Sequence, residues 1–242
     1  MITRSDRCFA KAVQIENLCF SYPDGTRALE AVSLDIYQGE KVALIGPNGA
    51  GKSTLLLHLN GVFFCNGNIQ ILGMKPDKKN LKSIRQKVGL VFQNPDDQLF
   101  CPTVFDDVAF GARNLNLPQE QVAHRVQQAL EAVGLAGFEQ HSAFHLSFGE
   151  KKRVSIATVL AMDSQILALD EPTSNLDPRG KKDIVKLLRK IGGTQIIVTH
   201  DLSLVRNLCD RTVVLSKGKK VADGATEEIL NDQVFLESHD LA

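Results

Sequence analysis

The sequence has no excess of either charge and no cysteine pattern typical of a metal site. Lys and Arg together number 28, as do Asp and Glu, so the formal net charge of the 242 residues is zero. This balance argues against a protein held on nucleic acid mainly by global positive charge, although it leaves room for a local basic patch. The five cysteines include no CxxC pair and their number is odd. Free, buried thiols in a reducing compartment are therefore favoured over a disulfide framework or a zinc site.

Long apolar runs are also missing. No stretch approaches the roughly 20 residues that a membrane-spanning helix needs, and the N-terminal MITRSDRCFAKAV lacks the apolar region of a secretory signal. We therefore expect a soluble, cytoplasmic protein, which could still dock on a membrane protein. The first ten or so residues are expected to form a loose tail. The hydrophobic content of 43% is enough for a core in one domain, or in a domain with a subdomain.

What is present is a series of short strand-like segments. VSLDI (32–36) alternates apolar and polar residues, as a half-exposed antiparallel strand does. TVVLSKGKKVADG (212–224) predicts a hairpin that turns near Lys217 and Gly218. Compact apolar runs typical of buried parallel strands are KVALIG (41–46), VGLVF (88–92), QILALD (165–170) and QIIVTH (195–200).

A helical region separates two of these strands. In PQEQVAHRVQQALEAVGL, apolar residues recur every three or four positions, Pro118 suits the first turn and Gly134 suits the end. KKRVSIATVLAM predicts a second helix. We therefore expect a helical subdomain at about 94–160, inserted in a parallel α/β core. Such a core holds its ligand at the carboxyl ends of its strands.

The most specific motif is GPNGAGKST at positions 46–54, which fits GxxxxGK(S/T) after an apolar strand and before TLLLHLNG, a candidate helix. Its glycines let backbone N–H groups converge on an anion at a helix N-terminus. Lys52 is expected to reach the β- and γ-phosphates and Ser53 to ligate Mg²⁺. A chance match is the alternative, and the flanking strand and helix argue against it. The predicted nucleotide-binding residues of this loop are Gly46, Asn48, Gly49, Gly51, Lys52, Ser53 and Thr54.

Polar residues follow three further apolar runs. Asp170 and Glu171 end ILALDE, where Asp170 is predicted to hold Mg²⁺ and Glu171 to act as general base toward a water. Gln93 ends another run and is predicted to contact Mg²⁺ or the attacking water. His200 ends a third run and is predicted to contact the γ-phosphate. A solvated acidic turn, or a structural Gln or His, is the plain alternative for each alone. Parallel strands bring all these ends to one edge, which favours the shared site.

These motifs, in this order, resemble those of the ATP-binding cassette (ABC) ATPases over about 13–230. GPNGAGKST is similar to the Walker A loop, ILALDE to Walker B, VFQ to the Q-loop, SNLD to the D-loop, which ends at Asp177, and VTHD to the His switch. LSFGE falls at the place of the family's LSGGQ signature. Tyr22 matches the aromatic residue that stacks on adenine, although alone a core tyrosine is equally favoured.

The resemblance implies a P-loop NTPase fold of the α/β class. Its parts are a RecA-like parallel-sheet core, an antiparallel β subdomain and the inserted α-helical subdomain. The ABC-type ATP-binding domain is expected at 11–230, and a C-terminal tail at 231–242. ATP and Mg²⁺ are the implied cofactors, and ATP hydrolysis is the implied activity.

The family pairs two cassettes head to tail, with each ATP between the P-loop of one and the signature of the other. Ser147 and the N–H of Gly149 would then contact a nucleotide bound mainly by a second cassette, and Phe148 is left free to point elsewhere. Alone, LSFGEK is equally well read as a helix cap. The dimer is of two copies or of two related cassettes, and Glu150, in place of the more frequent Gln, has no assigned role.

QNPDDQLFCPTVFDDVAFGARNL (93–115) resembles the cassettes of energy-coupling-factor importers, especially the cobalt and nickel branch. The resemblance implies a transmembrane coupling subunit and a substrate-binding membrane subunit as partners, at the cytoplasmic face of the membrane. Nucleic acid is not expected. Four acids are candidates to pair with basic residues on a helix of the coupling subunit: Asp96, Asp97, Asp106 and Asp107. The plain alternative for these acids is a solvated acidic surface. A vitamin importer, a cassette acting on nucleic acid or ribosomes, and a regulatory ATP-binding module remain the alternatives.

Overall fold

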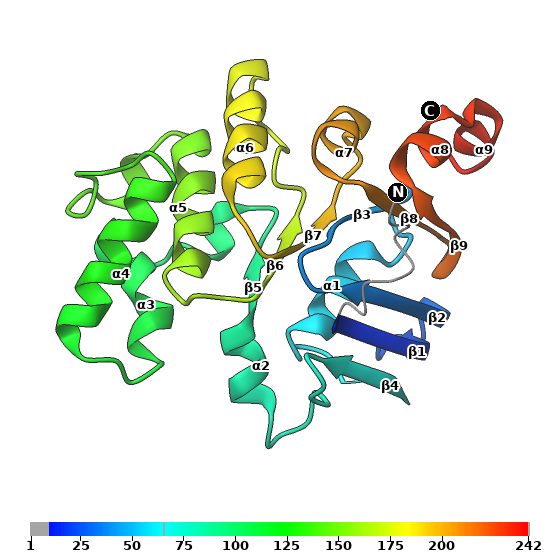
Figure 1. Ribbon diagram of the computed structural model, residues 1–242, viewed down its shortest axis with the longest axis horizontal. Coiled ribbons are helices and arrows are strands. Elements are labelled where there is room, and N and C mark those ends of the chain that lie inside the picture. The colour runs from blue at the N-terminus through cyan, green and yellow to red at the C-terminus, as the bar shows by residue number, and fades with distance from the viewer. Residues whose placement is uncertain (1–9, 65, 242) are drawn as a thin grey trace, which may run out of the picture.

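A computed structural model describes residues 10–64 and 66–241, which form two β-sheets surrounded by helices (Figure 1). The predicted N-terminal tail lies almost entirely outside the described residues, as do Cys8 and Cys65. Among the described helices, none combines the length and the apolar character that crossing a bilayer requires.

The larger sheet has six strands in the order β5-β6-β7-β3-β8-β9, of which the first five are parallel and β9 is antiparallel to β8. These strands are β3 (Lys41–Ile45), β5 (Val88–Val91), β6 (Ile166–Asp170), β7 (Thr194–Val198), β8 (Arg211–Ser216) and β9 (Lys219–Ala225). The predicted hairpin between β8 and β9 is confirmed. Lys217 and Gly218 have φ of 48° and 78°, and positive φ at both central residues suits a tight hairpin turn.

Each buried strand contributes alternate side chains to two hydrophobic clusters. Val42 and Leu44 belong to one cluster, and Ala43 and Ile45 belong to the other. Successive residues of a strand point to opposite faces of its sheet, so both faces of this sheet are covered. This burial explains why the predicted parallel strands are uninterrupted apolar runs.

The smaller sheet is antiparallel, in the order β2-β1-β4, and lies below β8 and β9 in Figure 1. Its strands are β1 (Lys11–Ser21), β2 (Arg27–Tyr37) and β4 (Asn66–Ile71). Residues 32–36 of β2 alternate between buried and partly exposed, as their alternating apolar and polar sequence predicts.

Three longer helices stand together at one side of the molecule, between β5 and β6 in the chain (green and yellow-green in Figure 1). They are α3 (Val104–Arg113), α4 (Gln119–Ala132) and α5 (Phe148–Leu160), with the short 3₁₀ helices η2 (Pro95–Asp97) and η3 (Ala143–His145). Pro118 is the N-cap residue of α4, one position before the predicted first turn, and Gly134 follows its end with φ of 71°. The predicted α/β architecture with an inserted helical part is therefore confirmed.

The remaining helices pack around the larger sheet and at the chain's C-terminal end. They are α1 (Lys52–Leu59), α2 (Leu81–Lys87), α6 (Pro178–Lys190), α7 (Leu202–Leu208), α8 (Thr226–Asn231) and α9 (Gln233–Ser238). Leu236 of α9 is 3% exposed and belongs to a core cluster. The predicted C-terminal tail is therefore a packed helical segment over its described part.

The cysteines agree with their prediction only in part. Cys19, Cys101 and Cys209 are free thiols, as predicted, but Cys19 is exposed and Cys101 is partly exposed. Only Cys209 among these three is buried, where desolvation raises the pKa of its thiol to about 12.

Candidate functional site

The predicted phosphate loop connects β3 to α1, and its glycines are required by the backbone. Gly51 has φ of 96°, and a Cβ there would lie 2.4 Å from the carbonyl oxygen of Ala28. At Gly46 the corresponding distance to the carbonyl oxygen of Leu215 is 2.1 Å. A side chain at either position would collide with backbone, so the loop depends on glycine to approach its neighbours.

Lys52, the first residue of α1, extends back along this loop. Its Nζ donates hydrogen bonds to the carbonyl oxygens of Gly46, at 2.7 Å, and Pro47, at 2.9 Å. Burial lowers the pKa of Lys52, whereas the charges of Glu171 and Asp170 raise it. The ammonium therefore lies within the loop, where it can exchange carbonyl partners for phosphate oxygens.

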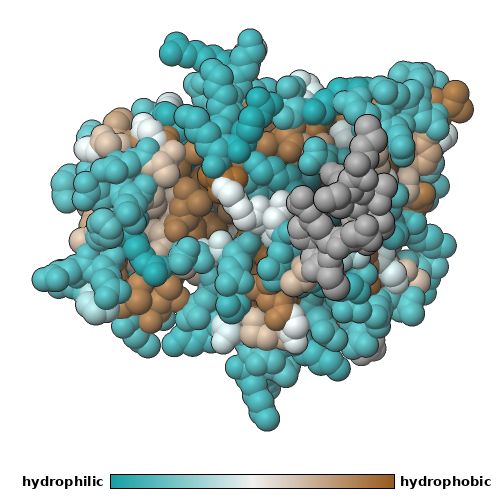
Figure 2. Space-filling view, in the orientation of Figure 1, coloured by the Kyte–Doolittle hydropathy of each residue, from teal (hydrophilic) through white to brown (hydrophobic). Residues whose placement is uncertain are grey.

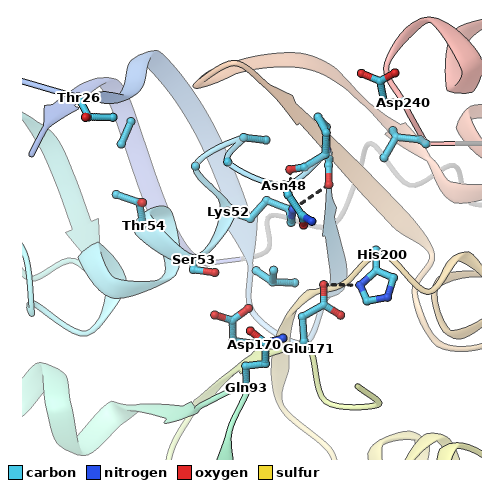
Figure 3. Close-up of a pocket in the computed structure, with 18 of the residues that line it drawn as sticks. Thr26, Asn48, Lys52, Ser53, Thr54, Gln93, Asp170, Glu171, His200 and Asp240 are labelled. Carbon is cyan, nitrogen blue, oxygen red and sulfur yellow. Dashed lines mark hydrogen bonds and ion pairs between the residues drawn. The ribbon is translucent and has the colours of Figure 1, made fainter. Parts of the chain in front are cut away.

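Asp170 ends β6 close to Ser53 and Gln93, and Figure 3 shows the three side chains together below the phosphate loop. Burial raises the pKa of Asp170, and a hydrogen bond from Ser53 lowers it. Asp170 Oδ1 is buried and has no hydrogen-bond partner among the described residues. Carboxylate, hydroxyl and amide oxygens are ligands that Mg²⁺ accepts, usually beside phosphate oxygens. The unpartnered oxygen and the donor set therefore fit a magnesium ion.

Glu171 follows β6 and is 8% exposed. Its Oε1 lies 2.9 Å from Nδ1 of His200, the contact dashed in Figure 3, and its Oε2 accepts a hydrogen bond from the hydroxyl of Thr199 at 3.2 Å. Its φ is 46°, a conformation that costs energy for a residue with a side chain. The carboxylate is therefore held in one orientation, in the wall of a cavity that Glu171 shares with the phosphate loop.

Tyr22 directly follows β1 of the smaller sheet and lines the same cavity as the phosphate loop. Its hydroxyl shares a hydrogen bond of 2.8 Å with the hydroxyl of Thr54. Its ring meets Phe20 and Phe63 edge to face, with centroids 5.2 and 5.8 Å apart. A ring held by aromatic neighbours in a cavity wall is suited to contact a flat base.

Most of the predicted site residues line one cavity of about 880 Å³. These are Tyr22, Gly46, Asn48, Gly49, Gly51, Lys52, Ser53, Thr54, Gln93, Asp170, Glu171 and His200. The carboxyl ends of parallel strands thus meet at one edge of the sheet, as expected.

Ser147, Gly149 and Asp177 are not part of this cavity but line another, of about 380 Å³. Ser147 is the N-cap residue of α5 and Asp177 that of α6. Phe148 lines the same second cavity, and its ring lies 5.8 Å from Nζ of Lys152. Within one chain, the signature segment and the phosphate loop are therefore separate surfaces.

Glu150, for which the sequence suggested no role, completes a capping box with Ser147. Its Oε2 accepts hydrogen bonds from the backbone N–H and the hydroxyl of Ser147, at 2.9 and 2.6 Å. The spacing Ser-x-x-Glu before an apolar helix is the known signal for this motif, so the sequence could have revealed it. LSFGEK is therefore a helix cap whatever else it binds.

Other residues of the site were not predicted. Thr26, Asp240 and Leu241 also line the larger cavity, and Figure 3 places Asp240 at its edge near the C-terminal end. Lys152, two residues after the signature segment LSFGE, contacts the backbone of both Gln93 and Glu171. These contacts depend on the fold, and no local sequence signal identifies them.

Comparison with known proteins agrees with this geometry. The family model described as ABC transporter matches residues 29–174. The energy-coupling factor transporter ATP-binding protein EcfA of Methanocaldococcus jannaschii is 51% identical over 226 residues, which cover 91% of this chain and 81% of that protein. The structure of cbiO1 from Clostridium perfringens, described as part of the ABC transporter complex cbiONQ, has a TM-score of 0.84. It is 38% identical, with coverage of 96% of this chain and 95% of that one.

A further solved structure shows a related cassette after hydrolysis. The ATP-binding cassette MJ0796, described as dimeric and bound to ADP and Pi, has a TM-score of 0.79 and 30% identity. The match covers 88% of this chain and 98% of that one. With its phosphate loop, its carboxylate pair and this similarity, the chain belongs to the ABC transporter family, as one of its nucleotide-binding ATPases.

Proposed function

We propose that this chain is the ATP-hydrolysing subunit of a membrane importer of the energy-coupling-factor type. The similarity to EcfA, over 91% of the chain, supports this assignment. The transported substrate is proposed to be cobalt or nickel ions, from the resemblance of residues 93–115 to that branch. A vitamin is the second candidate.

In the proposed reaction, Lys52 binds the β- and γ-phosphates and Tyr22 contacts the adenine. Ser53, Gln93 and Asp170 would hold Mg²⁺, which neutralises charge on the transferred phosphoryl group when it is bound. Glu171 accepts a proton from the attacking water, and His200, at 2.9 Å from its carboxylate, contacts the γ-phosphate. Thr199 and His200 keep the Glu171 carboxylate in place for that transfer.

Two cassettes are proposed to complete each site. Ser147 and the N–H of Gly149 would approach the γ-phosphate bound in the larger cavity of the other cassette, and Asp177 would lie beside this contact. The N-terminus of α5 favours negative charge there. The separation of the two cavities within one chain, and the dimeric state described for MJ0796, support this arrangement.

The observation that best supports a membrane partner is an apolar groove of about 670 Å³ between the edge of the larger sheet and the helical part. Phe100 and Phe110, which line it, are 61% and 50% exposed, and their rings lie 5.1 Å apart. Figure 2 shows hydrophobic surface over α3 and α5 on this side of the molecule. An apolar groove of this kind suits the hydrophobic face of a helix from another subunit.

A buried carboxylate of Asp107 lies in the same groove. Its Oδ1 accepts hydrogen bonds of 2.9 Å from the backbone N–H groups of Phe100 and Cys101, while its buried Oδ2 has no partner among the described residues. Burial raises the pKa of Asp107, and the backbone hydrogen bonds lower it. A buried, half-satisfied carboxylate is costly until a cation pairs with it, so a basic residue of the coupling helix is its proposed partner.

The other three acids of this region differ from Asp107. Asp96, which is exposed, pairs with Lys151 at 2.7 Å, and Asp106, which is partly exposed, pairs with Arg113 at 3.0 Å. Asp97 lines the groove with Asp107. We therefore place the proposed contact with the coupling subunit at Asp107 and Asp97.

The test is to purify the tagged chain from detergent-solubilised membranes and identify the membrane proteins that accompany it. Asp107→Asn keeps an oxygen for the two backbone N–H groups but loses the charge, so recovery of the coupling subunit should fall about tenfold or more. Glu227→Gln, which removes an exposed acid that pairs with Arg206 far from the groove, should recover it fully.

The recovered complex is then placed in liposomes. It should transport labelled cobalt or nickel only when ATP is present on the side of the bilayer where the cassette lies. Uptake of a vitamin instead would support the second candidate. A chain that recovers no membrane protein, but binds nucleic acid with strong salt dependence, would support a cassette acting on nucleic acid.

A further inference from the structure

Lys152 is a fully buried lysine on α5, two residues after the capping residue Glu150. It is 0% exposed and is among the largest fully buried side chains of the described residues. A buried ammonium is costly unless polar partners replace its water. The pKa of Lys152 is lowered to about 8, mainly by burial and in spite of the charges of Asp170 and Glu171, which raise it.

The partners of Lys152 belong to two distant segments. Its Nζ donates hydrogen bonds to the carbonyl oxygen of Gln93, at 2.5 Å, and to that of Glu171, at 3.0 Å. The ring of Phe148 lies 5.8 Å from the same nitrogen. One ammonium therefore joins the second residue after β5, the first residue after β6 and the first turn of α5.

Both carbonyls belong to residues whose side chains line the nucleotide cavity. The Glu171 carbonyl also accepts hydrogen bonds from the backbone N–H and the hydroxyl of Ser174, at 3.1 and 2.9 Å. Glu171 has φ of 46°, so its peptide needs such partners to keep this orientation. A rotation of either peptide would move the side chain that projects into the cavity.

We propose that Lys152 is a positioning residue for ATP hydrolysis, which fixes Gln93 and Glu171 through their carbonyl oxygens and links them to the signature segment. This inference rests on the proposed roles of Gln93 and Glu171 in the reaction. A shift of α5, when Ser147 and Gly149 meet the partner cassette's nucleotide, would reach the chain's own catalytic carboxylate through this side chain.

The alternative is that Lys152 only stabilises the fold, and a matched lysine separates the two. Lys41 also donates hydrogen bonds to two backbone carbonyl oxygens, those of Leu188 at 2.8 Å and Arg189 at 3.2 Å. It is the first residue of β3, at the opposite end of this strand from the phosphate loop. Lys41→Met therefore removes the same kind of contact without touching the cavity.

The experiment compares Lys152→Met, Lys152→Arg and Lys41→Met by KM for ATP and by kcat per nucleotide-binding site. Counting sites with a fluorescent ATP analogue removes the effect of any unfolded fraction. We expect Lys152→Met to lower kcat about 100-fold, since small displacements of catalytic groups cost rate on this scale. Its KM should change by less than about threefold, because uniform binding is retained. Lys41→Met should keep the wild-type kcat per site.

A wild-type kcat per site in Lys152→Met overturns the inference, as does an equal loss in Lys41→Met. If Lys152→Met yields no binding sites, Lys152→Arg decides, because its planar head cannot meet both carbonyls in the same geometry. A lowered kcat with unchanged KM then supports positioning, and a wild-type kcat overturns it. Glu171→Gln, measured alongside, tests the proposed role of Glu171 in hydrolysis separately from the positioning role of Lys152. If that variant is slow while Lys152→Met is not, only the role of Lys152 falls.

Discussion

Glu171 is the residue on which the proposed chemistry depends most directly. The residue is 8% exposed, its carboxylate contacts Thr199 and His200, and its φ is 46°. Glu171→Gln keeps the shape of the side chain but cannot accept a proton from water. We expect kcat to fall about 10²- to 10⁴-fold, the usual contribution of a general base, while ATP still binds. Phosphate release and equilibrium ATP binding measure the two effects, and wild-type turnover would refute the assignment.

Gly51 tests whether the phosphate loop depends on close backbone approach. Gly51→Ala places a Cβ 2.4 Å from the carbonyl oxygen of Ala28, at φ of 96°. Gly39→Ala is the matched control, since Gly39 has φ of 82° but no heavy atom within 4 Å of the added Cβ. Both changes should lower the free energy of unfolding by about 1 kcal/mol or more. Only Gly51→Ala should also abolish ATP binding, and equal ATP affinities in the two variants would contradict the steric argument.

At the scale of elements, the first turn of α5 combines a structural cap with a proposed binding surface. Glu150→Ala removes the acceptor for the N–H and hydroxyl of Ser147. Loss of a capping interaction costs about 1 kcal/mol, and the amides at the start of α5 should exchange faster with solvent. Urea denaturation and hydrogen exchange measure these changes, and unaltered exchange at the start of α5 would contradict them.

The same cap should depend on pH. Hydrogen bonds from Ser147 lower the pKa of Glu150 below its ordinary value of 4.5. A carboxyl group with a lowered pKa in the folded state stabilises the protein above its unfolded pKa, and this contribution is lost as pH falls through the folded pKa. Glu150→Gln keeps the shape of the cap without the charge. Its free energy of unfolding should therefore be lower than that of the wild type at neutral pH. The difference should vanish in strong acid.

The elements that could be predicted from the sequence are those with strong local patterns. β3 and the phosphate loop follow from an apolar run and from glycine spacing, and the hairpin at Lys217 from turn chemistry. α9 was not predicted, because a six-residue helix with one buried residue, Leu236, has no measurable period. The contacts of Lys152 lie 59 and 19 residues away in the chain. They depend on packing between segments, which no local pattern encodes.

At the scale of the whole molecule, two half-sites lie on separate surfaces of one chain. The larger cavity collects the phosphate loop and the carboxylates, and the smaller one collects the N-termini of α5 and α6. Lys152 lies between them, in contact with the backbone of the first and carried by the helix of the second. This arrangement predicts that dimerisation and hydrolysis respond to changes in the same helix.

Ser147→Arg tests the proposed contact across the dimer. Ser147 is exposed and lines the smaller cavity but not the larger one, so an added guanidinium there starts outside the site that binds the nucleotide of its own chain. In the Glu171→Gln background, we expect ATP-driven dimerisation to weaken about tenfold or more, since a bulky charge at a close-packed interface is costly. ATP affinity of the monomer should change by less than about twofold because its own cavity is intact. Analytical ultracentrifugation with and without ATP measures the dimer.

Two controls separate this contact from other effects of the substitution. Gln127→Arg adds the same charge at an exposed position of α4, away from both cavities, and should leave dimerisation unchanged. Glu150→Ala removes the capping box but leaves the Ser147 hydroxyl in place, so it reports the effect of a weaker helix end alone. If Ser147→Arg lowers monomer ATP affinity as much as it weakens the dimer, the two half-sites are not joined between chains. If it weakens the dimer no more than Glu150→Ala does, the serine acts as a cap and the contact across the dimer is refuted.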